Sequence, residues 1–564
     1  MKIFDSSLKW HQKLGFIILY LILFFGITGF IIAPIMNTVF RSFDTQTGSI
    51  IKNYIEYFAV SNNFKVLSNT LRLGIFTVIT CGLVGTSLAF YMGFINIRNR
   101  KLVHILLLSP MMVPGVIIVI SFIQLYGESG LITKSIQGIL GMNNLPYVFN
   151  GFGGILFIHT YTQYVYFYLN ISISLKYLDY STVEAARSLG ASKLHVFRTV
   201  LLPFIAPALI SSAMVTFIAG ISSFSAPNLL GGRYKVLSTQ IMLSKANNHM
   251  DMASMQVVVL MAMGLSILFL MRHFEGKYSQ ESSVRGSEIP KLEIENNWIR
   301  ITFKGCMSFL LIMITLPVLS ILILSFASSS SMMMDIFPKD FGLWNYSKII
   351  EKKRVLKPFL NSIIMSLETC FIGLGIALPV AYLTTKKKNI LNRAAEILIM
   401  LPLVMPASTV AINLINTFNR KSLFSFNKIL IGTYWILPLA YIIIALPIFL
   451  RLNIIAMESF NINFEYASRS LGAGSRRTFI KITAPIIMPA IISGATLVFI
   501  KTLGEYTMSA LLYGVHNRPV SIAMVSAMQE FDIGLSMAYG SIIMLICFVA
   551  MVIILRLDKD KYSS

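Results

Sequence analysis

The chain has 564 residues, of which 55% are hydrophobic and 13% are charged, and its mean hydropathy is +0.73. Soluble globular proteins carry roughly a quarter charged residues, so this composition excludes an ordinary soluble enzyme and a disordered protein. The net charge of +23 comes from short basic clusters between apolar runs, a pattern that does not indicate a nucleic-acid-binding face. The composition predicts an all-α polytopic membrane protein.

Apolar runs of membrane-spanning length recur along the whole chain. A spanning helix needs about 20 apolar residues, and about twelve runs meet this length, in two sets of six. The first run exceeds the apolar core of a cleaved signal peptide, so we expect it to remain as a helix. The expected spans are 14–36, 71–93, 102–125, 150–172, 204–226 and 254–271, then 305–327, 361–384, 394–416, 432–450, 486–511 and 535–555.

The basic residues predict the orientation of these spans. Lys and Arg are more frequent in the connections that face the cytoplasm if both termini are cytoplasmic, as the positive-inside rule requires, although the cluster between Lys348 and Lys357 is an exception. The long polar stretch 272–304 follows the sixth span and is expected to be a cytoplasmic linker. It separates a first repeat, 1–271, from a second repeat, 305–564.

The two repeats share sequence in register. The segment EAARSLGASKLHVFRTVLLPFIAPAL from Glu184 recurs as YASRSLGAGSRRTFIKITAPIIMPAI from Tyr466, 282 residues later and half the chain length apart. A second register, offset by 292, pairs Asn69 with Asn361. Six spans is an even number, so the copies are parallel and related by an axis along the membrane normal. The same register pairs the prolines expected to kink the third span of each half, Pro110 and Pro114 with Pro402 and Pro406.

The repeated segment connects the fourth and fifth spans on the expected cytoplasmic side. Small residues precede a glycine, Gly190 or Gly472, which permits a tight turn, and a proline re-enters the membrane. This arrangement predicts a helix–turn–helix projection onto which a partner docks; the alternative is an ordinary amphipathic loop. The chain has no P-loop, so any nucleotide hydrolysis requires another subunit.

This segment resembles the EAA loop of permease subunits in binding-protein-dependent ABC importers. In the second copy Tyr466-Ala467-Ser468 replaces Glu-Ala-Ala and the acid, Glu465, lies one residue early. The residues that the resemblance assigns to ATPase coupling, within the loops at about 182–203 and 464–485, are Glu184, Ala185, Ala186, Gly190, Pro203, Glu465, Ala467, Gly472 and Pro485.

The resemblance implies a type I ABC importer permease fold in the cytoplasmic membrane. It further implies an ATPase dimer that binds ATP and Mg, and an extracytoplasmic solute-binding protein, as partners in the lipid bilayer. The chain itself would bind no cofactor and catalyse no bond chemistry, and no metal-ligand set is identified in it.

Two fused halves are typical of ferric-iron and thiamine permeases, and residues 221–241 look most like the ferric-iron branch. Thiamine, polyamine and aminoalkylphosphonate permeases remain alternatives for the substrate. An ion-coupled secondary transporter is a rival architecture, although the scarcity of charge within the spans disfavours it. An intramembrane enzyme is a further rival, and the chain carries no motif that supports it.

Ionisable residues within spans are candidates for the transport pathway. Lys501 and Glu505 are four residues apart in the expected eleventh span, so they should share a helix face and pair; a structural ion pair is the alternative. His159 is expected to make an interhelical hydrogen bond. In the first half, the candidates for the pathway are Ser223, Phe224 and Pro227.

Overall fold

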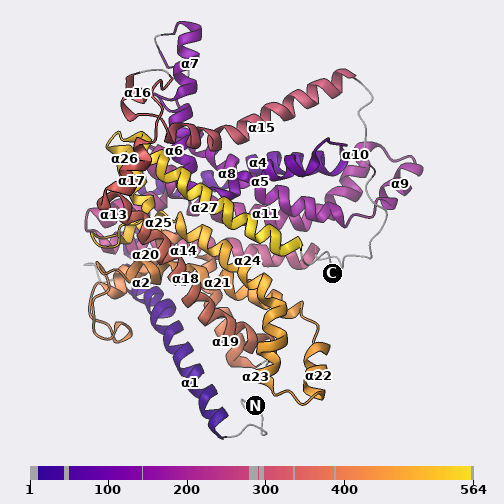
Figure 1. The fold of residues 1–564 in the computed structure, drawn as a ribbon, viewed down its shortest axis with the longest axis vertical. Helices are drawn as coiled ribbons and strands as arrows, with labels where there is room; N and C mark the ends of the chain where they lie inside the picture. The colour runs from indigo at the N-terminus through magenta and orange to yellow at the C-terminus, as the bar shows by residue number, and fades with distance from the viewer. Residues whose placement is uncertain are drawn as a thin grey trace.

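The computed structural model describes residues 10–43, 50–142, 144–145, 147–278, 290, 297–334, 337–386 and 389–559. These residues form helices and loops, with no β-strand among them (Figure 1). The helices of the first half are α1 (Trp10–Ile27), η1 (Thr28–Ile32), α2 (Ala33–Phe43), α3 (Ile50–Ala59), α4 (Ser61–Phe94), α5 (Arg100–Met112), α6 (Gly115–Tyr126), α7 (Leu131–Leu140), α8 (Gly151–Lys176), α9 (Ser181–Ser188), α10 (Lys193–Val196), η2 (Phe197–Leu201), α11 (Leu202–Ser222), α12 (Ser225–Leu230), α13 (Leu237–Ala246) and α14 (Met250–Tyr278).

The second half repeats this order of long and short helices. Its elements are α15 (Asn297–Ser325), α16 (Ser329–Met334), α17 (Trp344–Glu351), α18 (Lys353–Lys386), α19 (Ile390–Met400), η3 (Leu401–Val404), α20 (Ala407–Phe418), η4 (Leu423–Ser425), α21 (Ile436–Glu458), α22 (Asn463–Ser470), α23 (Ser475–Thr478), η5 (Phe479–Thr483), α24 (Ala484–Leu503), α25 (Thr507–Leu512), α26 (Val520–Gln529) and α27 (Ile533–Lys559).

Ten helical segments are long and apolar enough to cross a membrane, and a bent pair makes an eleventh. Nine of the ten coincide with predicted spans, whereas the tenth, Gly115–Leu140, overlaps only the end of the predicted span 102–125. The remaining predicted span, 150–172, is the helix α8, which is rich in buried tyrosines and packs against α4, α11 and α5. Because α8 is enclosed by other helices, it does not need a lipid-facing apolar surface. The all-helical membrane fold is therefore confirmed.

The proline-containing third span of each half is broken, as the sequence predicts. In the first half, α5 ends at Met112 and Pro114 is the extended residue before α6. In the second half, the axis bends by 111° between Ile390–Val404 and Ala407–Phe418. Proline lacks the N–H that would continue the helical hydrogen bonds.

The fifth and eleventh spans end earlier than predicted. We expected continuous helices over 204–226 and 486–511, but α11 ends at Ser222 and α24 ends at Leu503. A short helix, α12 or α25, follows each break. Both breaks fall in the same place of the repeat, so they belong to the architecture of each half.

Matching hydrogen bonds support the second register of the repeat. The side-chain amide of Asn69 donates to the carbonyl of Lys235, and that of Asn361 donates to the carbonyl of Arg518, each at 3.0 Å. Both asparagines lie on the second span of their half and hold the segment after the short helix. The two copies therefore use the paired asparagines in the same way.

The first span of each half packs against the core of the other half. α2 packs on α20 of the second half and on α14, while α15 packs on α5 and α6 of the first half. Hydrogen bonds hold both contacts: the Asn416 amide donates to Thr38 at 3.0 Å, and the Ser121 hydroxyl donates to the Pro317 carbonyl at 2.8 Å. The halves are thus interlocked, not simply adjacent.

The repeated loops lie on one side of the molecule. In Figure 1, α9 and α10 are at the right and α22 and α23 at the lower right, whereas α13, α17 and α26 are at the left. We call the former the loop side and the latter the opposite side. The interior of the predicted linker 272–304 and both chain termini lie outside the described residues, although α14 extends to Tyr278 and α15 begins at Asn297.

Candidate functional site

The first repeated loop is the helix–turn–helix that the sequence predicts. α9 ends at Ser188, Gly190 turns the chain with φ of +84°, and α10 and η2 lead into α11, where Pro203 lies in the first turn. This φ is in the left-handed region, which glycine adopts without the steric cost that a Cβ brings. The turn therefore depends on glycine at this position.

The second loop has the same shape. α22 ends at Ser470, Gly472 has φ of +82°, and Pro485 lies in the first turn of α24. At the tip of each loop a leucine precedes the glycine, and Leu189 and Leu471 are both 89% exposed. A single exposed apolar side chain is not unusual on a protein surface, but both loops present the same leucine at the same place before the glycine. These leucines were not selected from the sequence, although they match in the repeat.

The predicted coupling residues of the first loop mostly face outward. Glu184 and Ala185 are exposed on α9 and Ala186 is half-buried, while Val183 faces inward. The inward side forms a small apolar cluster of Tyr180, Val183 and Val196, with Phe94, Ala186, Ala191, Val200 and Leu201 packed around it.

In the second loop the acidic residue does not lie on the surface. Glu465 is 5% exposed, its carboxylate lies 2.9 Å from the Lys386 ammonium, and Thr483 donates a hydrogen bond to it at 3.2 Å. The position equivalent to Glu184 is occupied by Tyr466, whose side chain is exposed, next to exposed Ala467. Glu465 therefore joins the loop to the end of α18.

An aromatic pair attaches each loop to the second span of its half. Phe90 contacts Phe197, with ring centroids 6.0 Å apart, and Tyr382 contacts Phe479 at 5.4 Å. The partners correspond in the repeat. Movement of either loop is thereby linked to a long helix, α4 or α18, that crosses the membrane.

The prediction that Lys501 and Glu505 share one helix face is wrong, because α24 ends at Leu503 and Glu505 lies in the break. The Glu505 carboxylate accepts from the backbone N–H groups of Met508 and Ser509 at 3.0 and 3.1 Å, so it caps α25. Lys501 is exposed in the last turn of α24, and among the described residues no ion pair to it is found.

In the first half a histidine supports the equivalent break. His159 is buried, with one ring nitrogen 3.0 Å from the Thr77 hydroxyl and the other 2.7 Å from the Ser223 hydroxyl. The expected interhelical hydrogen bond of His159 is confirmed. In the second half Tyr441 occupies the equivalent position, with its hydroxyl 2.8 Å from that of Ser509.

The two breaks bring the halves into contact. Phe224 and Tyr506, which correspond in the repeat, have ring centroids 5.6 Å apart, and the Asn228 amide donates to the Tyr506 hydroxyl at 2.9 Å. Equivalent residues touch only near the axis that relates the copies, so this contact marks the pseudo-twofold axis. Phe224 was predicted, as was buried Pro227, but Tyr506 was missed even though it lies 282 residues after Phe224.

A glycine permits a further contact between the halves. A Cβ on Gly504 would lie 2.1 Å from a side-chain carbon of Pro114, in the broken third span of the first half. Only a residue without a side chain fits this approach. The breaks in the eleventh and third spans therefore pack directly against each other.

Acidic, cysteine and histidine side chains do not gather into a metal-binding group of three or more among the described residues. Phe224, Tyr506 and Asn228 offer aromatic and amide groups, and Lys501 offers an ammonium.

Comparisons with known proteins agree with this geometry. The family described as "Binding-protein-dependent transport system inner membrane component" matches residues 85–280 and again 372–561. The chain is 30% identical over 501 residues, 88% of each chain, to a probable ABC transporter permease protein y4fN of Sinorhizobium fredii. It is 24% identical over 506 residues to the ferric transport system permease protein FbpB of Actinobacillus pleuropneumoniae, covering 88% of this chain and 71% of the relative.

A shorter relative matches about half of the chain. It is a spermidine/putrescine transport system permease protein PotC homolog of Mycoplasma pneumoniae, 27% identical over 268 residues, which are 46% of this chain and 89% of the relative. The family occurs twice in one chain, as the internal repeat predicts. This protein therefore belongs to the family of ABC transporter permeases, the inner-membrane components of binding-protein-dependent transport systems, with two permease units fused in one chain.

Proposed function

We propose that this permease imports ferric iron, which an extracytoplasmic binding protein delivers and which a separate ATPase dimer drives across the membrane. The observation that carries the coupling part is the pair of matching loop tips. Leu189 and Leu471 are equally exposed, each before a glycine of positive φ, on one side of the molecule. Two equivalent docking projections suit a partner that has two equivalent clefts.

Iron is the cargo that the relatives favour. The ferric permease FbpB matches across both halves, whereas the PotC homolog matches about half of the chain. Thiamine, polyamines and aminoalkylphosphonates are the competing cargoes. The chain would contribute the pathway and the coupling loops, while ATP and Mg would bind to the partner.

In this proposal the contact between Phe224 and Tyr506 closes the pathway toward the opposite side. Both residues follow the ends of α11 and α24, which run directly from the coupling loops. A push or pull on Gly190 or Gly472 would reach the axis through a single helix in each half. Separation of the two rings would then open the pathway toward the binding protein.

Uptake in cells tests the cargo and the energy source together. Radioactive iron(III), thiamine, a polyamine and an aminoalkylphosphonate are supplied to cells with and without the gene, and to cells whose partner ATPase carries an inactivating ATP-site substitution. We expect iron uptake alone to fall in both deficient strains. Loss of another solute would replace iron and retain the permease, whereas uptake that survives loss of the ATPase and collapses with the ion gradient would overturn ATP coupling.

A further inference from the structure

A groove of about 360 Å³ lies between α1 and α18, the second span of the other half. Its walls come from α1, η1, α18 and α21, with one residue of α19, and every lining residue is apolar. Ile22 and Ile372 at its edge are 66% and 40% exposed. Because α1 and α18 belong to membrane spans, the groove opens toward the hydrocarbon of the bilayer.

The groove lies in the leaflet on the loop side. On α18 its lining extends from Ile372 to Leu383, one turn before Lys386, where the second loop is attached. At 1.5 Å per residue this is about 16 Å along the helix. Half of a hydrocarbon core of about 30 Å is about 15 Å, so the groove runs the depth of one leaflet.

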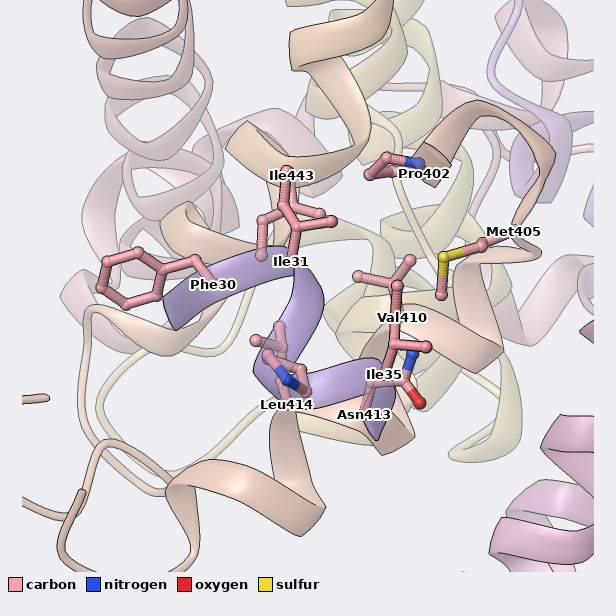
Figure 2. Close-up of a pocket in the computed structure, with 10 residues that line it drawn as sticks. Phe30, Ile31, Ile35, Pro402, Met405, Val410, Asn413, Leu414 and Ile443 are labelled. Carbon is pink, nitrogen blue, oxygen red and sulfur yellow. The ribbon is translucent and has the colours of Figure 1, made fainter. Parts of the chain in front are cut away.

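At its opposite end the groove borders a much smaller pocket. Phe30, Ile31 and Ile443 line both the groove and a small neighbouring pocket of about 10 Å³. Figure 2 shows Ile31 beside Ile443, with Val410 and Leu414 of α20 on the far side of this small pocket. An occupant of the groove therefore enters from the lipid side and stops near the middle of the membrane.

The shape and chemistry of the groove select its occupant. The groove has a volume of about 360 Å³ and extends along about 16 Å of α18, so it is elongated along the helix. Cavities lined by Leu, Ile and Phe stay free of water and take up apolar molecules at roughly 150 Å³. A single hydrocarbon chain fits both the length and the apolar lining of the groove.

Two glycines leave this space open. At Gly26 of α1 and Gly375 of α18, both in the lining, no heavy atom lies within 4 Å of the position of a Cβ. α1 is fastened at the loop-side end, where the Tyr20 hydroxyl donates to Asn392 of α19 at 2.6 Å. Between the Tyr20–Asn392 hydrogen bond and the end of the groove at Phe30 and Ile31, no protein side chain fills the space between α1 and α18.

We propose that this groove is a binding site for one acyl chain of a bilayer phospholipid. The acyl chain fills the space between the first helix of one half and the core of the other half. Because α18 also carries Lys386, the bound chain lies against the helix that holds the second coupling loop.

Photolabelling in lipid nanodiscs tests the site. The full chain is reconstituted with a phospholipid that carries a diazirine near the end of one acyl chain, irradiated, and digested for mass spectrometry. We expect labelling of 19–31 and 372–383 to exceed that of open lipid-facing surfaces such as α15. Gly375→Leu should lower labelling of both segments at least threefold, because the added side chain fills the groove.

Gly305→Leu is the matched control, since Gly305 is a helical glycine with equally open surroundings outside the groove. It should leave labelling of the groove unchanged. If Gly375→Leu does not fold, Gly26→Leu fills the groove from the other wall, and the wild-type labelling pattern decides if neither folds. Labelling of both segments no stronger than that of open surfaces, or equal in folded filled variants and wild type, would overturn the proposal.

Discussion

The two repeated loops, 182–203 and 464–485, have the same backbone shape and differ in the side-chain contacts that attach them to the rest of the protein. Both have a glycine of positive φ, an exposed leucine before it, and an aromatic contact to the second span. In the first half the inward side is apolar, with Val183 packed near Phe94. In the second half Glu465 and Lys386 stand at the same two positions of the repeat and form an ion pair.

The residues beside these two positions also differ between the loops. Ala186 and Val196 of the first loop correspond to Ser468 and Thr478 of the second, whose hydroxyls are hydrogen-bonded at 2.9 Å. An apolar contact tolerates sliding, whereas an ion pair with hydrogen bonds holds one geometry. The comparison teaches that the outer surfaces of the two loops are alike, while their inner attachments are chemically distinct.

The strongest test of equivalent docking is a charge at each tip. Leu189→Asp and Leu471→Asp should each lower ATP-driven uptake about tenfold or more, since a buried apolar anchor commonly contributes 2 kcal/mol or more at an interface. Uptake in cells measures this loss, and binding of the purified ATPase to each variant in nanodiscs measures whether docking is weakened. Ile139→Asp, at a residue 83% exposed on α7, serves as control; loss in only one of the two loop variants would show that the tips are not equivalent.

Replacing the Glu465–Lys386 ion pair by the apolar residues of the first half tests whether the second loop requires an ion pair at these two positions. Glu465→Ala should destabilise the chain by about 1–3 kcal/mol, less than a fully buried pair because Lys386 is partly exposed. Glu465→Val with Lys386→Phe recreates the residues of the first half and should recover much of this loss. Thermal unfolding of the single and double variants measures the coupling between the sites.

Uptake by the same variants separates stability from coupling. If the double variant regains stability and not uptake, the ion pair transmits force to α18 in a way that the apolar contact does not. If it regains neither, Val and Phe do not pack here as they do in the first half, and the proposed equivalence of the two positions fails.

A smaller effect on ATPase binding is expected from substitution of the turn glycines, which have the same conformation in both loops. Gly190→Ala and Gly472→Ala place a Cβ in the left-handed region, at a cost of about 1–2 kcal/mol. Each should weaken ATPase binding by a similar factor, about tenfold. Gly474→Ala, two residues away, has open surroundings and no positive φ, and should bind as wild type; unequal effects of the first two changes would indicate that only one turn is used.

The sequence predicts the spans and the repeat because both depend on local features, namely the length of apolar runs and matching residues at fixed offsets. It does not predict that α2 packs on the second half and α15 on the first half, since the apolar face of a helix does not specify which helix it will contact. The ends of α11 and α24 were missed because the chain stays apolar through Phe224 and Leu511.

Glu465 shows how much one residue of displacement matters. A helix turns by about 100° per residue, so moving the acid by one position carries it from the outer to the inner face of α22. The equivalent residue, Val183, is apolar and buried, which is the feature that could have predicted the inward direction. Its partner, Lys386, comes from 79 residues earlier, and such a distant pairing is visible only in the fold.

A second ion pair of the second half, on the opposite side of the molecule, also differs from its counterpart in the first half. Lys348 of α17 pairs with Asp532, just before α27, and Ser329 donates to Asp532 at 2.9 Å. α14 begins at Met250 and α27 at Ile533, so the residue before each helix, His249 or Asp532, corresponds in the two halves. Lys348 corresponds to Glu56 at the offset of 292, so the acidic and basic residues are exchanged. Burial acts to raise the pKa of Asp532, but the hydrogen bonds from Lys348 and Ser329 outweigh it and hold the pKa below its ordinary value.

The pH dependence of this pair follows from that direction. Because the folded pKa of Asp532 is depressed, its contribution to stability is present above the unfolded pKa of about 3.9 and is lost as the pH falls through the folded pKa. Both side chains are partly exposed, so Asp532→Asn should cost less than about 1 kcal/mol near neutral pH. Unfolding of wild type and variant at neutral and acidic pH measures the difference, which should shrink in acid; a difference that is unchanged by pH would assign the loss to packing and leave Lys386 with Glu465 as the ion pair that distinguishes the halves.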